Sequence, residues 1–230
     1  MVEQLLTYER EAFFALNGSD YAFLDRFMWV FTGKVVWLPL AAFLIFMLVR
    51  RKNWREWLLV FLAIALTITL CDQFASHICK PYFLRFRPTH HPDFMDQVKV
   101  VFDYRGGKYG FISSHAANAF GFAMLISLIL KNRLATWTFF IWAAMTAYTR
   151  IYLGVHFITD IIPGALSGLF FGALVYVLYR KVRTRWILAD HPSDQPLYSA
   201  RTARYMAYAV WIMMIAILVL NQPLVALLRG

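Results

Sequence analysis

The chain has 230 residues, of which 60% are hydrophobic and 18% aromatic, and its mean hydropathy is +0.54. This exceeds what the core of a soluble domain of that length needs, so the composition excludes an ordinary soluble protein and indicates that lipid is part of its solvent. The formal net charge of +10 does not indicate nucleic-acid binding, because Lys and Arg gather in loops between apolar stretches and around one candidate site.

The first 22 residues mix apolar with charged side chains and predict an amphipathic helix on the membrane surface. Leu5 and Phe13 are among its apolar positions, and Glu9 and Arg10 are among its charged ones. A short helix packed on the loops above a membrane bundle would explain the same pattern. The segment lacks the basic start and continuous apolar run of a secretory signal peptide.

Six apolar stretches follow, and a stretch of about 20 residues is what a helix needs to cross about 30 Å of hydrocarbon. The predicted fold is therefore an all-α integral membrane bundle of about six transmembrane helices. The predicted spans are Phe27–Val49, Trp57–Cys79, about Phe111–Leu130, Leu134 to about Tyr152, His156–Tyr179, and Tyr205 to about Leu220.

Alternating crossings bring three polar segments to one face of the membrane. The end of the second span, the start of the third and the turn between the fourth and fifth emerge together; they carry Lys80–Pro88, Ser113–His115 and Arg150–Asp160. Within the last segment His156 and Asp160 are four residues apart. On a helix they share a face, so the carboxylate can fix the imidazole tautomer and raise its basicity.

Counting positive charges in the loops predicts the orientation of this polar face. The opposite face carries twelve Lys and Arg residues, at 50–56, 131–133 and 180–204, whereas the polar face carries ten, including Lys80, Arg87 and Arg150. Cytoplasmic loops hold the excess of Lys and Arg in membrane proteins. We therefore expect the polar face to lie outside the cytoplasm.

Three cations in one pocket indicate an anionic ligand. Arg87 and Arg150 each present a planar fork that matches phosphate oxygens, and Lys80 adds a compact charge. Ser113 and the backbone N–H groups at the start of the span near His115 could add donors where a helix dipole favours negative charge. A phosphate ester at the membrane surface fits this set best.

In these positions the chain resembles the type 2 phosphatidic acid phosphatase superfamily, whose motifs run Lys-x6-Arg-Pro, Pro-Ser-Gly-His and Ser-Arg-x5-His-x3-Asp. The resemblance covers about residues 57–179. It departs from the pattern at Ile112, Ser114 and Thr149, none of which removes a titratable group. The matching residues are Lys80, Arg87 and Pro88 in the first motif, Ser113 and His115 in the second, and Arg150, His156 and Asp160 in the third.

The resemblance implies hydrolysis through a phosphohistidine intermediate. His156 would attack phosphorus, Asp160 would orient it, and His115 would protonate the leaving oxygen and then activate water. The phosphoryl oxygens would be held by Lys80, Arg87, Ser113, Ser114 and Arg150. No metal or cofactor is expected, because these cations already neutralise the phosphate charge.

The hydropathy pattern, the charge count and the resemblance together predict a single membrane domain over 1–230 in a bacterial inner membrane, with the site facing the periplasm. Its parts would be an interfacial helix at 1–22, a catalytic core at 57–179, a cytoplasmic loop at 180–204 and the last span within 205–228. The substrate would be a phosphorylated membrane lipid: a phospholipid, undecaprenyl pyrophosphate or a lipid A type glycolipid. The sequence ranks none of these, and it does not indicate the oligomeric state.

Two other functions stay open for the same residues. A phosphotransferase would pass the phosphate from the same histidine to an alcohol in place of water. A non-enzymatic lipid transporter or receptor would need the cations but not the full set of two histidines and an aspartate. Product analysis separates the first from a phosphatase, and substitution of His156 separates the second.

Several polar residues outside the motifs have structural interpretations. Arg85 is interpreted as a headgroup-contacting or snorkelling residue, as are Lys99, Arg105 and Lys108. Asp72 and Lys34 are intramembrane and should face the bundle, and Asp72 either supports the first motif or pairs with another span. The small-residue stripe in the fifth span predicts close contact with a neighbouring helix; it consists of Gly164, Gly168 and Gly172.

Overall fold

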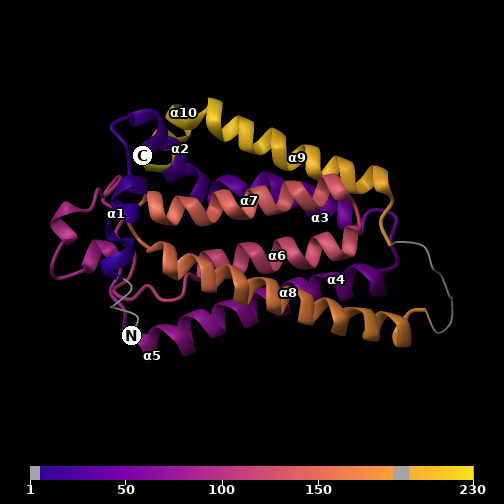
Figure 1. Cartoon of the computed structure of the whole chain (residues 1–230). Coiled ribbons are helices and arrows are strands. Elements are labelled where there is room, and N and C mark those ends of the chain that lie inside the picture. Colours follow the sequence, from indigo (N-terminus) through magenta and orange to yellow (C-terminus); the bar gives the residue numbers. More distant parts are fainter. Residues whose placement is uncertain (1–5, 189–196, 230) are drawn as a thin grey trace.

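The computed structural model describes residues 6–188 and 197–229, and every regular element in those ranges is a helix. Figure 1 shows α3, α4, α6, α7, α8 and α9 lying roughly parallel, which confirms the predicted all-α bundle. The helices are α1 (Leu6–Leu16), α2 (Ala22–Thr32), α3 (Leu38–Val49), α4 (Trp54–Gln73), α5 (Lys80–Phe83), α6 (Ser114–Leu130), α7 (Arg133–Tyr152), α8 (Ile158–Trp186), α9 (Ala200–Val219) and α10 (Asn221–Arg229).

Three helices in the described ranges are long and apolar enough to cross a membrane. They are Trp54–Phe83, which joins α4 to α5, and the helices α8 and α9. The pair α2 and α3 together would make a fourth, bent by 69°. Helix α6 is apolar but has only 17 residues. The membrane bundle therefore has three or four spans by this criterion, and the count of six remains a prediction.

The helix boundaries differ from the predicted ones where charge was taken as the end of a helix. Helix α8 continues to Trp186, seven residues beyond the predicted end, and α9 begins at Ala200. Arg183 in the extension donates to the carboxylate of Glu56 from Nε and Nη2 at 2.8–3.1 Å. Basic residues therefore mark the end of the apolar part of a span but not the end of the helix, because long basic side chains are good helix formers. Residues 189–196 of the predicted loop lie outside the described ranges.

A break divides the first predicted span, and the last span ends near its predicted end. The stretch Phe27–Val49 is interrupted at Gly33 and Lys34, after which a short 3₁₀ turn leads into α3. The final segment stops at Val219, and α10 begins anew at Asn221. The Asn221 side chain donates to the carbonyl of Leu218 at 2.6 Å, which satisfies a terminal carbonyl of α9.

Close packing of α6 against α8 fixes the relative position of their first turns. A Cβ on Gly172 would lie 2.5 Å from the carbonyl oxygen of Gly121, and one on Gly168 would overlap the carbonyl oxygen of Ala117. The small-residue stripe therefore makes the predicted helix contact. The same approach brings the start of α6 to α8, where the Ser113 N–H donates to the carbonyl of Asp160 at 3.0 Å.

Helix α1 lies across one end of the bundle, beside the start of α8 (Figure 1). Phe13 is fully buried and packs edge-on against Phe157, with ring centroids 5.2 Å apart. Phe14 contacts Phe94 in the same way at 5.8 Å. The described part of this helix therefore packs on the loops above the bundle, as the second interpretation predicts, and its position on the membrane surface remains a prediction; residues 1–5 lie outside the described ranges.

Candidate active site

The segment after α5 places two arginines on one side of an extended chain. Phe86 forms an antiparallel bridge with Tyr109, supported by Arg87 N–H to Lys108 O at 3.0 Å and by Gly110 N–H to the carbonyl of the residue before Phe86 at 2.9 Å. Alternate residues of extended chain point to the same side. Arg85 and Arg87 therefore both reach toward the start of α8, while Phe86 points away.

The turn between α7 and α8 carries His156, and the first turn of α8 carries Asp160. Gly154 has a φ of +72°, and a Cβ there would lie 2.6 Å from Val98, so the turn requires glycine. Asp160 Oδ2 accepts from the Phe157 N–H at 3.0 Å and lies 3.3 Å from His156 Nδ1. The predicted pair is brought together although His156 precedes the helix.

The other ring nitrogen of His156 faces a cation. Arg87 Nη1 lies 3.2 Å from His156 Nε2 and donates to the carbonyl of Val155 at 3.2 Å. When Nδ1 carries its proton toward Asp160, Nε2 holds the lone pair that meets this guanidinium. The geometry therefore presents Nε2 to whatever Arg87 binds.

Burial, together with the charges of Arg87, Arg150 and Lys80, holds the pKa of His156 well below its ordinary value of 6.5. Burial beside Arg150 lowers the pKa of Arg87 to about 10, which leaves it charged at neutral pH. The site thus combines a neutral imidazole with an excess of positive charge. This is the arrangement that an anion would complete.

Arg150 is 1% exposed and held by neutral partners. Its Nη1 donates to Thr32 Oγ1 at 2.6 Å, and its Nη2 donates to the Tyr104 hydroxyl at 2.8 Å. No described carboxylate forms an ion pair with Arg87 or Arg150. A buried cation without a counter-charge is costly, so both guanidinium groups favour an anionic ligand.

Lys80 joins the second motif through hydroxyl groups. Its Nζ donates to Ser114 Oγ at 2.6 Å and to Ser76 Oγ at 3.1 Å, and Ser76 donates to Asp72 at 3.4 Å. The helix is a π-helix from Phe74 to Cys79, a form found often at functional sites. Asp72 thus supports the first motif, one of the two roles expected for it.

Helix α6 begins at the same place. Ser113 caps it by accepting from the Ala116 N–H at 3.4 Å, and its own N–H is taken by Asp160. His115 lies within electrostatic range of Arg87, Arg150 and His156. The structure therefore gathers all eight predicted site residues at one end of the bundle, with the Ser113 N–H already occupied.

The interpretation of Arg85 as a headgroup-contacting residue is wrong. Its side chain is fully buried, with Nη1 donating to Asp160 Oδ1 at 2.8 Å and to Thr159 Oγ1 at 2.6 Å, and with Nη2 paired to Glu9 of α1. Glu9 also accepts from the Thr159 N–H at 3.0 Å. The alternation of two arginines around Phe86 could have indicated Arg85, but nothing in the sequence indicates Glu9.

No three His, Cys, Asp or Glu side chains within 6–188 and 197–229 lie close enough to hold a metal ion. His156, Asp160 and the surrounding cations lie together on this face. They can bind a phosphate ester and present a nucleophilic nitrogen to it.

The sequence profile of the PAP2 superfamily matches residues 56–184. This range holds the site residues His115, His156 and Asp160 and the cations Lys80, Arg87 and Arg150. The chain belongs to the PAP2 superfamily. Among similar PAP2 proteins, one from Porphyromonas gingivalis named lipid A 4′-phosphatase is 41% identical over 229 residues, 99% of this chain and 97% of its own. One of the same name from Bacteroides thetaiotaomicron is 37% identical over 193 residues, 84% of this chain and 85% of its own.

A solved structure shares the fold of this PAP2 chain. The crystal structure of Aquifex aeolicus LpxE superimposes with a TM-score of 0.55 at 28% identity, over 73% of this chain and 94% of that one. The PAP2 chain is therefore a phosphoric ester hydrolase, a multi-pass membrane lipid phosphatase whose substrate is a phosphorylated membrane lipid.

Proposed function

We propose that this phosphatase removes a phosphate from a lipid A type glycolipid through a phosphohistidine on His156. The observation that carries the mechanism is the line from Asp160 through His156 to Arg87, with contacts of 3.3 and 3.2 Å on the two ring nitrogens. The substrate class is supported by two relatives named lipid A 4′-phosphatase, one of them similar over nearly the whole chain.

In the first step the substrate phosphate replaces the contact between Arg87 and His156 and lies among Lys80, Arg87 and Arg150. His156 Nε2 attacks phosphorus, the bond to the leaving oxygen breaks, and His115 gives that oxygen a proton. Fixed cations at the phosphoryl oxygens stabilise the charge of the transition state. A positioned general acid contributes about 10²- to 10⁴-fold.

In the second step water hydrolyses the phosphohistidine. His115, now neutral, takes a proton from the attacking water, and the bond between phosphorus and His156 Nε2 breaks to release inorganic phosphate. Asp160 stabilises the imidazole as charge develops and keeps Nδ1 protonated. Two histidines are thus sufficient for both steps, because His115 is restored to its protonated form at the end.

We further propose that the site faces the periplasm from the inner membrane. Loop and helix-end cations at the far end of the bundle support this orientation, because cytoplasmic segments hold the excess of Lys and Arg. Figure 1 shows the C-terminal end of α8 and the N-terminal end of α9 at that end, opposite α1. Arg180, Lys181, Arg185, Arg201 and Arg204 lie on these two helix ends.

Phosphate release by the purified protein tests the proposal, with lipid A, phosphatidic acid and undecaprenyl pyrophosphate as substrates. Wild type should release phosphate from lipid A and carry an acid-labile phosphoryl label, and His156→Ala should do neither. His77→Ala is the matched control, because His77 is an exposed histidine outside the site. Wild-type rates of phosphate release by His156→Ala would overturn the assignment of His156 as the nucleophile. Phosphate release only from a lipid other than lipid A would overturn the proposed substrate.

A further inference from the structure

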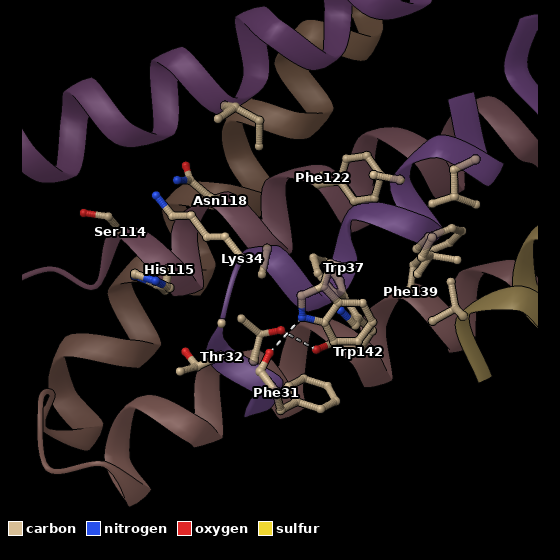
Figure 2. A pocket seen from close by; sticks show the side chains of 18 of the residues that line it. Phe31, Thr32, Lys34, Trp37, Ser114, His115, Asn118, Phe122, Phe139 and Trp142 are labelled. Carbon is tan, nitrogen blue, oxygen red and sulfur yellow. Dashed lines mark hydrogen bonds between the residues drawn. The ribbon is translucent and has the colours of Figure 1, made fainter. Parts of the chain in front are cut away.

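A cavity of about 480 Å³ adjoins the site on the side of His115. Of the site residues only Ser114 and His115 line it, whereas Arg87, Arg150 and His156 do not. Figure 2 shows Ser114 and His115 toward one end of this cavity, with Phe122 and other aromatic residues toward the other. The cavity therefore begins at His115, the proposed general acid, and extends away from His156, the proposed nucleophile.

The bend between α2 and α3 forms one wall of this cavity. Gly33 and Lys34 at the bend both line it, and Lys34 is also exposed, so the cavity reaches the surface of the bundle there. Most of the remaining lining is apolar, with Trp37 and Leu44 from α3 and its preceding turn and with Phe139 and Trp142 from α7. Such a lining favours hydrocarbon over a solvated group.

The direction of the reaction indicates what enters. In phosphoryl transfer the attacking and leaving atoms lie roughly in line across phosphorus. With His156 on one side, the leaving alcohol lies on the other, where His115 and this cavity are. A water-soluble alcohol would gain nothing from an aromatic lining, but a lipid alcohol would bury its chain there.

Two polar groups in the cavity indicate how the hydrocarbon chain of the lipid alcohol is linked to it. Asn118 is three residues beyond His115 and shares its face of α6, and its Oδ1 is buried without a hydrogen-bond partner among the described residues. Lys34 also lines the cavity, and its ammonium has no hydrogen bond or ion pair with any described residue. Asn118 Oδ1 needs a donor and the Lys34 ammonium needs an acceptor.

We propose that the cavity holds an amide-linked acyl chain of the leaving alcohol, an assignment that rests on the proposed function. The amide N–H donates to Asn118 Oδ1, its carbonyl accepts from Lys34, and the chain lies against the aromatic lining. An ester linkage would leave the Asn118 oxygen without a donor. An acylated amino sugar that carries the scissile phosphate has this combination of groups.

Adjacent alanines on α3 provide a matched test. Ala41 lines the cavity and Ala42 does not, and both are exposed, so each position tolerates a larger side chain. The substrates are a glucosamine phosphate with a long amide-linked acyl chain and the same sugar phosphate without it. The measured quantity is the ratio of kcat/KM for the acylated substrate to kcat/KM for the other.

Ala41→Phe should lower this ratio by about fifteen-fold, because exclusion of two methylenes costs about fourfold each, while Ala42→Phe should keep the wild-type ratio. Lys34→Met, at the exposed rim, should also lower the ratio about tenfold, because a hydrogen bond to a charged donor is lost. This second variant decides the matter if Ala41→Phe does not fold.

An equal ratio in Ala41→Phe and Ala42→Phe would overturn the cavity assignment, and so would an unchanged ratio in Lys34→Met. A wild-type protein that releases phosphate from neither substrate would instead overturn the proposed function. The two failures are therefore distinguishable in one set of assays.

Discussion

Replacement of Arg85 by methionine is expected to destabilise the protein by about 3–5 kcal/mol, because it removes one partner of a buried ion-pair network. The Arg85 side chain is 0% exposed, and its partners Asp160 and Glu9 are 0% and 7% exposed. Methionine keeps most of the apolar stem but leaves both carboxylates without their counter-charge. For a chain of this length the loss corresponds to a melting temperature lower by about 6–20 °C.

Arg10→Met is the control for this prediction. Arg10 is an exposed cation of α1, adjacent to Glu9, whose guanidinium donates to Gln97 at 3.1 Å and lies over the Phe94 ring. Its removal should cost at most about 1 kcal/mol. Thermal unfolding in detergent, followed for both variants under identical conditions, gives the comparison.

A double variant tests whether the three groups act together. Adding Glu9→Gln to Arg85→Met removes one of the two orphaned carboxylates, so the double variant should be more stable than the sum of the single effects by about 1 kcal/mol or more. Strictly additive effects, or an Arg85→Met melting temperature within about 2 °C of Arg10→Met, would refute the interpretation of this cluster as a buried ionic network.

Three further predictions concern packing and chemistry. Gly168→Leu should prevent α6 from approaching α8 at Ala117 and abolish a folded, monodisperse protein in size-exclusion chromatography, whereas Leu166→Ala, at an exposed position, should not. Because burial and then the charge of Arg87 lower the pKa of His156, the acid limb of kcat/KM should lie below pH 6.5 in wild type and move to higher pH in Arg87→Met; an unmoved limb would contradict the electrostatic effect of Arg87. His115→Ala should slow poor leaving groups most, and an equal loss across leaving groups of different pKa would show that His115 positions substrate without protonating it.

The sequence was sufficient to predict that these polar residues lie together, because polar groups in apolar spans are rare and their spacing is specific. The site residues lie in three segments separated by tens of residues: Lys80 and Arg87, Ser113 and His115, and Arg150 and His156. The predicted alternating crossings bring those segments together at one end of the bundle. This constraint does not depend on the angle or the packing of any helix.

Other features depend on packing that no local pattern encodes. Glu9 and Arg85 are 76 residues apart, and they meet only because α1 folds back across the end of the bundle. In the sequence, the stretch around Gly33 and Lys34 is part of one continuous apolar span, and glycine is common in membrane helices. In the structure the chain bends there, and this bend forms a wall of the cavity.

The sequence by itself therefore determined the membrane class, the helical bundle and the family, because hydropathy and motif spacing are local properties of the chain. The tertiary structure alone decided that Arg85 holds Asp160, that α1 reaches the site through Glu9, and that a cavity opens beside His115. These are contacts between surfaces, and they depend on the relative placement of whole helices.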